Sequence, residues 1–136
     1  MELPWLGRWQ PQLLAILRIV VGLLFLEHAL IKLLGFPPGG KPGLQEVGSF
    51  LWFAGVIELV TSVLVLLGLF TRPAAFVAAG EMAVAYWMVH AKMGFYPAVN
   101  MGEGAILFCF VFLYIAAAGP GAWSVDGARL RNAPIR

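Results

Sequence analysis

The chain has 136 residues, of which 61% are hydrophobic and 12% carry a charge, and its mean hydropathy is +0.87. Soluble globular proteins carry roughly 25% charged residues, so this composition excludes an ordinary water-soluble domain and predicts one membrane domain over residues 1–136. The formal charge of +2 does not indicate nucleic-acid binding, because the basic residues gather at the ends of apolar segments, where positive charge sets membrane orientation.

Four apolar segments have about the 20 residues that a helix needs to cross a hydrocarbon core of roughly 30 Å. They lie at approximately residues 12–35, 50–70, 73–91 and 101–119. They predict an all-α fold, an antiparallel four-helix bundle in the plasma (inner) membrane. The first segment is interpreted as a span and not as a cleaved signal peptide, because its apolar core continues through EHALIKLLG without a small-residue cleavage site.

The connections between these segments differ in length and character. GFPPGGKPGLQEVG is rich in proline and glycine and is expected to be irregular. GLFTRP is short, so the second and third helices are expected to form a tight hairpin, with Pro73 in the first turn of the new helix. A Gly-Pro break at residues 119–120 ends the fourth helix.

Charge in the connections predicts the orientation. The side with both termini carries Arg8, Arg72, Arg129, Arg131 and Arg136. The two other loops carry only Lys41 and Lys92, so the positive-inside rule places both termini in the cytoplasm and these loops outside. Aromatic side chains near both surfaces are in the first instance interfacial anchors.

Ionisable side chains inside the apolar segments are the main functional signal. They are Glu27, His28, Lys32, Glu58, Glu81, His90 and Glu103, and all fall in the outer half of the predicted bundle or at its outer end. A charge at the bilayer centre costs on the order of 2.5 to 3.5 kcal/mol unless it is neutralised or paired. We therefore expect such groups to face the bundle interior, where they form ion pairs that fix helix register or a functional site.

Helical periodicity assigns faces to these residues at 100° per residue. Glu58 shares its face with the small and polar residues Ala54, Gly55, Thr61 and Ser62, and Glu81 shares its face with Ala74, Ala78 and Ala85. Arg18, His28 and Lys32 fall within about 80° of one another and are predicted to point inward. Glu27 projects about 180° from Arg18, and His90 about 180° from Glu81.

Several motifs resemble the DoxX family of small membrane proteins. The match includes LLAILRIVVGLLFLEHALIKLLGF, FAGVIELVTSVLVLLGLFTRPAA, NMGEGAILF and GPGAWSVD, and it covers essentially the whole chain. Family positions in these motifs correspond to Arg18, Gly22, His28, Lys32, Glu58, Arg72, Glu103, Ser124 and Asp126. Ala29 replaces a family glycine, and Glu27 and Glu81 stand where the family is usually apolar.

The resemblance implies a four-helix integral membrane protein associated with oxidoreductases, related to the membrane subunit of a thiosulfate:quinone oxidoreductase. In that reading, quinone chemistry needs titratable groups beside an apolar slot. We expect Glu58, His28, Lys32, Glu81 and Glu103 to handle protons. The ring would be lined by Trp52, Phe53, Tyr86, Trp87 and His90. The sequence has no CxxC pair, cluster cysteines or flavin fingerprint, so a redox partner protein would supply electrons.

Other readings stay open from the sequence. The carboxylates could form a relay in a transporter or a channel-like homo-oligomer, or the chain could be an anchor or scaffold without chemistry. A haem between His28 and His90, or a metal bound by histidine and glutamate, is disfavoured because no metal-ligand spacing is present. The single cysteine, Cys109, is interpreted as a small apolar packing residue.

Overall fold

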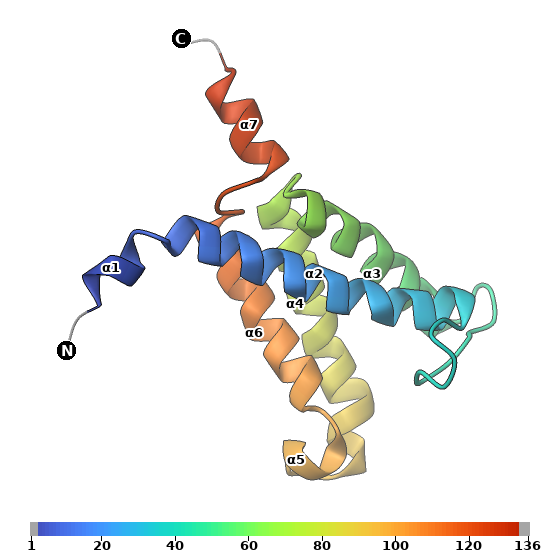
Figure 1. Ribbon diagram of the computed structural model, residues 1–136. Coiled ribbons are helices and arrows are strands. Elements are labelled where there is room, and N and C mark those ends of the chain that lie inside the picture. Colours follow the sequence, from blue (N-terminus) through green and yellow to red (C-terminus); the bar gives the residue numbers. More distant parts are fainter. Residues whose placement is uncertain (1–2, 134–136) are drawn as a thin grey trace.

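The computed structural model describes residues 3–133, and every regular element in this range is helical (Figure 1). Four longer helices are α2 (Gln10–Leu34), α3 (Phe50–Leu67), α4 (Thr71–Ala85) and α6 (Glu103–Ala118). The shorter elements are α1 (Pro4–Gly7), the π-helix η1 (Tyr86–His90), the 3-10 turn η2 (Ala91–Met93), α5 (Pro97–Asn100) and α7 (Val125–Arg131). Arg136, counted in the predicted orientation, lies outside the described residues.

Three helical stretches are long and apolar enough to cross a membrane: Gln10–Leu34, Phe50–Leu67 and Thr71–Met93. Their bounds agree with the first three predicted spans. The fourth predicted span is the shorter apolar helix α6, whose 16 residues extend about 24 Å, less than a hydrocarbon core of roughly 30 Å. Residues 35–49 contain no helix, as their proline and glycine content predicts.

The long helices form two pairs (Figure 1). α2 packs mainly against α3, and α4 packs mainly against α6, whereas α3 and α4 contact each other less and α2 touches α6 only slightly. The pairs meet where α3 ends and α6 ends, and they diverge toward the loops at residues 35–49 and 91–102. We call the meeting region, residues 8–18, 65–73 and 116–131, the arginine end.

Aromatic and small side chains join the two pairs. Phe25 of α2 lies 4.8 Å from Phe112 of α6 between ring centroids, in an edge-on arrangement, and both rings are fully buried. α4 contributes a run of buried alanines, Ala74, Ala75, Ala78 and Ala79. Small residues let helices approach closely in lipid, where packing and not water exclusion drives association. Gly22 serves the same purpose, because a Cβ there would lie 2.9 Å from Cγ of Leu66.

Arg18 is fully buried and binds the backbone at the C-terminal end of α3 and in the turn after α6. It donates five hydrogen bonds, of 2.7 to 3.3 Å, to the backbone carbonyl oxygens of Val65, Leu66, Pro120, Ala122 and Trp123. The last carbonyls of a helix have no partner inside the helix, and buried carbonyls need a hydrogen-bond donor from the protein. The guanidinium, with its five donors in a rigid fork, therefore satisfies both the end of α3 and the turn after α6.

Two other charged groups complete the arginine end. Arg72 donates through Nη1 to the carbonyl oxygens of Ala116 and Ala117 at the end of α6. Asp126 accepts hydrogen bonds from the backbone N–H of Phe70 and from the N–H and hydroxyl of Thr71, all at 2.9 Å, and so caps α4 from outside the helix. Although partial burial opposes it, these hydrogen bonds hold the pKa of the Asp126 carboxyl below its ordinary value.

Gly68 shows how tightly this region is closed. Its φ of +65° is in the left-handed region, and a Cβ there would lie 2.4 Å from Cβ of Ser124 and 3.1 Å from Nη1 of Arg18. Its carbonyl accepts a hydrogen bond of 2.8 Å from the N–H of Asp126. A side chain at this position would separate the end of α3 from the segment that leads into α7.

We expect the substitution Arg18→Lys to destabilise the protein by roughly 3 kcal/mol or more, because one ammonium cannot reach acceptors on both segments and each orphaned buried carbonyl costs about 1–3 kcal/mol. Thermal unfolding in an uncharged detergent measures the change. The control is Arg8→Lys, since Arg8 is exposed and only lies over the ring of Trp9. Equal melting temperatures for both variants would contradict the role given to Arg18.

Candidate functional site

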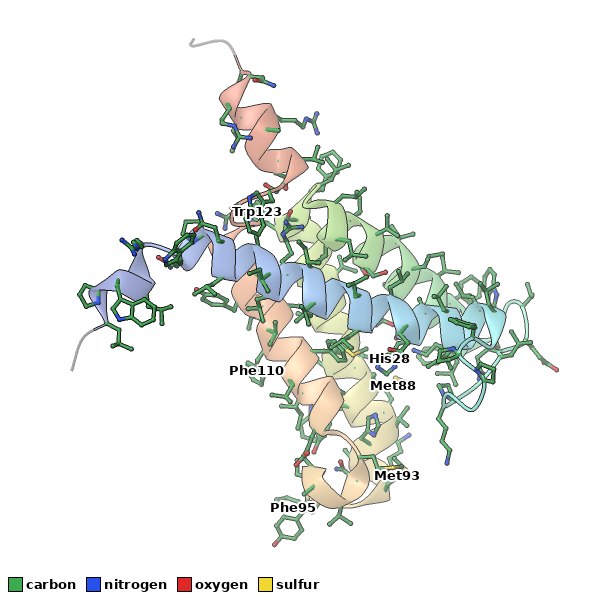
Figure 2. The ribbon with its side chains drawn as sticks, in the orientation of Figure 1. His28, Met88, Met93, Phe95, Phe110 and Trp123 are labelled. Atoms are coloured by element: carbon green, nitrogen blue, oxygen red, sulfur yellow. The ribbon has the colours of Figure 1, made fainter. Side chains whose placement is uncertain are left out.

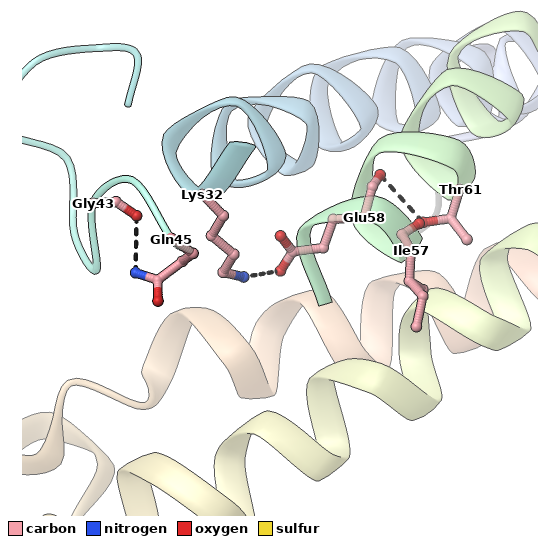
Figure 3. A network of polar contacts seen from close by, with 6 residues as sticks. All are labelled: Lys32, Gly43, Gln45, Ile57, Glu58 and Thr61. Atoms are coloured by element: carbon pink, nitrogen blue, oxygen red, sulfur yellow. Dashed lines mark hydrogen bonds and ion pairs between the residues drawn. The ribbon is translucent and has the colours of Figure 1, made fainter. Parts of the chain in front are cut away.

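A buried ion pair joins α2 to α3. The ammonium of Lys32 donates to Oε1 of Glu58, and the exposed fractions of the two residues are 8% and 0% (Figure 3). It is the sole ion pair within the described residues. This contact confirms the inward direction predicted for Glu58 and Lys32, and it is one of the register-fixing pairs expected from the sequence.

Local packing holds the pair in position. Gly55 brings α3 close to α2, because a Cβ at Gly55 would lie 3.0 Å from Cβ of Lys32. The N–H of Gln45 donates a 2.8 Å hydrogen bond to the carbonyl of Lys32, so the loop of residues 35–49 folds back onto the end of α2. Thr61 donates its hydroxyl to the carbonyls of Ile57 and Glu58, which leaves the carboxylate of Glu58 to face its partners on other helices (Figure 3).

Glu81 brings a second carboxylate to this pair from α4. Its charge interacts with both Glu58 and Lys32, and the residue is half-buried between the helical pairs. We call Lys32, Glu58 and Glu81 the acid–lysine cluster. The cluster draws on three helices and both helical pairs.

Two oxygens of the acid–lysine cluster have no partner. Oε2 of Glu58 and Oε2 of Glu81 are both buried, and neither accepts a hydrogen bond from any described residue. Buried polar atoms in native proteins are nearly always hydrogen-bonded, and exceptions call for an explanation such as a bound ligand or proton. The cluster therefore contains one ammonium, two carboxylates and two uncommitted acceptor oxygens.

His28 differs from its predicted position. Its face was expected to be enclosed with Arg18 and Lys32, but the residue is exposed. Its ring meets the ring of Phe108 of α6 edge-on, with centroids 5.6 Å apart, on the side of α2 that faces the second helical pair (Figure 2). His28 thus lies one turn from Lys32 on α2 and contacts the second helical pair through Phe108. Glu27 is exposed, as its opposite helical face predicts.

His90 lies in a different environment, at the end of α4. Its Nδ1 is 3.0 Å from the carbonyl oxygen of Asn100, and its ring stacks against Tyr86. The helix adopts π geometry over Tyr86–His90. The angle of about 180° between His90 and Glu81, which was calculated for an ideal α-helix, therefore does not apply there. No three histidine, cysteine, aspartate or glutamate side chains of the described chain come together as a metal site.

Asn100 organises the loop beyond the π-helix, a role that sequence reasoning missed. It is 1% exposed, donates to the carbonyl of Gly94 and the hydroxyl of Tyr86, and accepts from the N–H of Gly102. The available signal was an asparagine just before the predicted start of the fourth helix, where such residues commonly bind the backbone. Phe95 lies at the far tip of this loop (Figure 2).

The four aromatic residues predicted to line a quinone ring lie as two local pairs. Trp52 contacts Phe53 at the start of α3, and Tyr86 contacts Trp87 in η1. Within the described chain, no ring contact links one pair to the other, and Phe53 and Trp87 are exposed. Glu103 is also exposed, at the first turn of α6, where a negative charge favours the helix dipole.

Comparison with known proteins identifies the class of protein. The sequence profile of the DoxX family matches residues 13–91, more than half of the chain, so the protein belongs to the DoxX family. This range includes the acid–lysine cluster and Arg18. The predicted resemblance is confirmed.

Similar proteins carry no assigned activity. The chain is 46% identical over 125 residues to an uncharacterized protein of Haemophilus influenzae, covering 89% of this chain and 93% of the relative. It is 30% identical over 131 residues to the inner membrane protein YphA of Escherichia coli K12, with 88% and 92% covered. An uncharacterized membrane protein of Mycobacterium tuberculosis is 29% identical over 126 residues, with 81% and 77% covered. No solved structure matches. The protein is a membrane protein of this family.

The substitution Lys32→Met tests the ion pair. It leaves the carboxylate of Glu58 buried without its cation, which typically costs about 3–5 kcal/mol, whereas Lys32→Met combined with Glu58→Met removes both charges and is expected to recover most of that loss. Unfolding in detergent, followed by tryptophan fluorescence, compares the single and double variants. A double variant less stable than Lys32→Met would show that the two groups do not interact as a pair.

Proposed function

We propose that the protein is a proton-handling membrane subunit of a redox system, with the acid–lysine cluster as its exchange site. The observation that carries the proposal is the pair of unpartnered buried oxygens, Oε2 of Glu58 and Oε2 of Glu81, beside the ammonium of Lys32. A site built only to fix helix register needs one cation and one carboxylate. Glu81 adds an acidic group beyond that need.

The charges of the cluster support proton exchange. One ammonium balances one carboxylate, so full ionisation of all three residues leaves one net negative charge inside the membrane domain. An uncompensated charge at this depth costs several kcal/mol. A single proton held by Glu58 and Glu81 removes that cost. Two carboxylates beside one cation cannot both be ionised without this penalty, so we propose that the two residues share the proton.

Quinone is the proposed redox carrier, and the polar groups of the cluster suit it better than the aromatic ones. The Lys32 ammonium can donate to a quinone carbonyl, and the free oxygens of Glu58 and Glu81 can accept from quinol hydroxyls. Because the aromatic pairs at Trp52 and Tyr86 do not contact each other, they are not proposed to hold the ring together. Quinone supplies two-electron redox chemistry coupled to protons, and a partner protein supplies the electrons.

In this proposal, His28 transfers protons between the acid–lysine cluster and the medium outside the helical pairs. It is exposed, and it lies four residues before Lys32, on neighbouring turns of one helix. An imidazole at this place can carry protons between the cluster and the medium. His90 and Glu103, at the far end of the second pair, belong to a separate polar region around Asn100.

We also propose that α6 crosses the membrane together with the three longer helices and that both termini are cytoplasmic. An even number of crossings puts both termini on one side of the membrane, and the arginines at that end, Arg8, Arg72, Arg129 and Arg131, favour the cytoplasmic side. A 16-residue helix can be accommodated by local thinning of the bilayer.

Glu81→Gln tests the proposal, since it keeps the shape of the side chain and removes its charge. Purified protein in weakly buffered detergent is titrated with a short-chain quinol, and binding and proton release are followed by tryptophan fluorescence and a pH indicator. We expect Glu81→Gln to weaken quinol binding about tenfold, a change of roughly 1.4 kcal/mol, and to abolish the proton signal.

The matched control is Glu46→Gln, an exposed glutamate in the loop of residues 35–49, which is expected to behave as the unmodified protein. Proton flux in liposomes without any quinol would favour the transport or channel reading instead. If the unmodified protein neither binds quinol nor moves protons, the proposal is refuted and the interpretation as an anchor or scaffold remains.

A further inference from the structure

A groove that contains two arginines and an aspartate lies at the arginine end, away from the acid–lysine cluster. Its volume is about 680 Å³, and it runs between the start of α4, the turn after α6 and α7. We propose that this groove binds the phosphate headgroup of an anionic phospholipid. The residues used in the argument are Phe70, Arg72, Asp126, Arg129 and Leu130, all of which line it.

The two arginines give the groove its charge. Arg129 makes no hydrogen bond to a described residue, and its guanidinium lies over the ring of Phe70, 5.7 Å from the centroid. Arg72 uses Nη1 for the end of α6, which leaves Nη2 and Nε without a described acceptor. Asp126, the acidic residue of the groove, is committed to Phe70 and Thr71. Guanidinium groups with uncommitted N–H donors bind phosphate in bidentate geometry.

Apolar side chains flank the groove and suit the rest of a lipid. Phe70 is 56% exposed and Leu130 is 78% exposed, and both line the groove with the arginines. Trp123, at the same end, is 65% exposed and projects from the turn between α6 and α7 (Figure 2). Exposed aromatic residues beside arginines are typical of the membrane–water interface, where phospholipid headgroups are located. A soluble anion would not need this apolar border.

Native mass spectrometry tests the site. The full chain in an uncharged detergent is mixed with equal amounts of phosphatidylglycerol and phosphatidylcholine, which share acyl chains and differ in net charge. We expect the unmodified protein to retain phosphatidylglycerol preferentially, and Arg129→Gln to lower that preference about fivefold. Arg8→Gln is the control, because Arg8 lies at the same end but does not line the groove.

Two outcomes would overturn the assignment. One is an unchanged preference for phosphatidylglycerol in Arg129→Gln, with melting temperatures showing that the variant is folded. The other is displacement of the lipid by soluble glycerol phosphate at equal concentration, which would mean that the groove recognises a free phosphate ester and not a lipid. The quinol assay on the same variant keeps this result separate from the proposed proton exchange.

Discussion

The satisfaction of backbone carbonyls by Arg18 is the interaction on which the rest of the structure depends. The end of α3 and the turn after α6 leave buried carbonyl groups without a helical partner, and one buried guanidinium donates to five of them. Arg72 and Asp126 act in the same way on α6 and α4. Because these contacts fix the two helical pairs at one end, the pairs can diverge at the other and still form one domain.

That divergence defines the environment of the acid–lysine cluster. Lys32 and Glu58 join α2 to α3, and the charge of Glu81 on α4 interacts with both. The cluster therefore links helices through charged groups, as the contact between Phe25 and Phe112 links them through apolar rings. An ion pair alone would be a structural device. The second carboxylate, with its unpartnered buried oxygen, is what distinguishes this site from a register-fixing pair and favours a role in proton exchange.

Hydropathy and periodicity predicted much of this from the sequence: the helical class, the bounds of three spans and the inward faces of Glu58 and Lys32 are all found in the structure. The exposure of His28 could not be predicted, because helical phase gives the direction of a side chain but not its exposed fraction. The π-helix at Tyr86–His90 could not be predicted either, because the apolar pattern there is also that of an α-helix. The five acceptors of Arg18 lie up to 105 residues away, beyond any local pattern.

The central functional claim is that the acid–lysine cluster holds a proton that depends on Glu81. Infrared difference spectroscopy on the lipid-reconstituted protein measures this most directly, because a protonated carboxyl has a carbonyl band distinct from that of a carboxylate. The account predicts such a band at neutral pH in the unmodified protein and its loss in Glu81→Gln. A spectrum without a protonated carboxyl, or a band unaffected by that substitution, would contradict it.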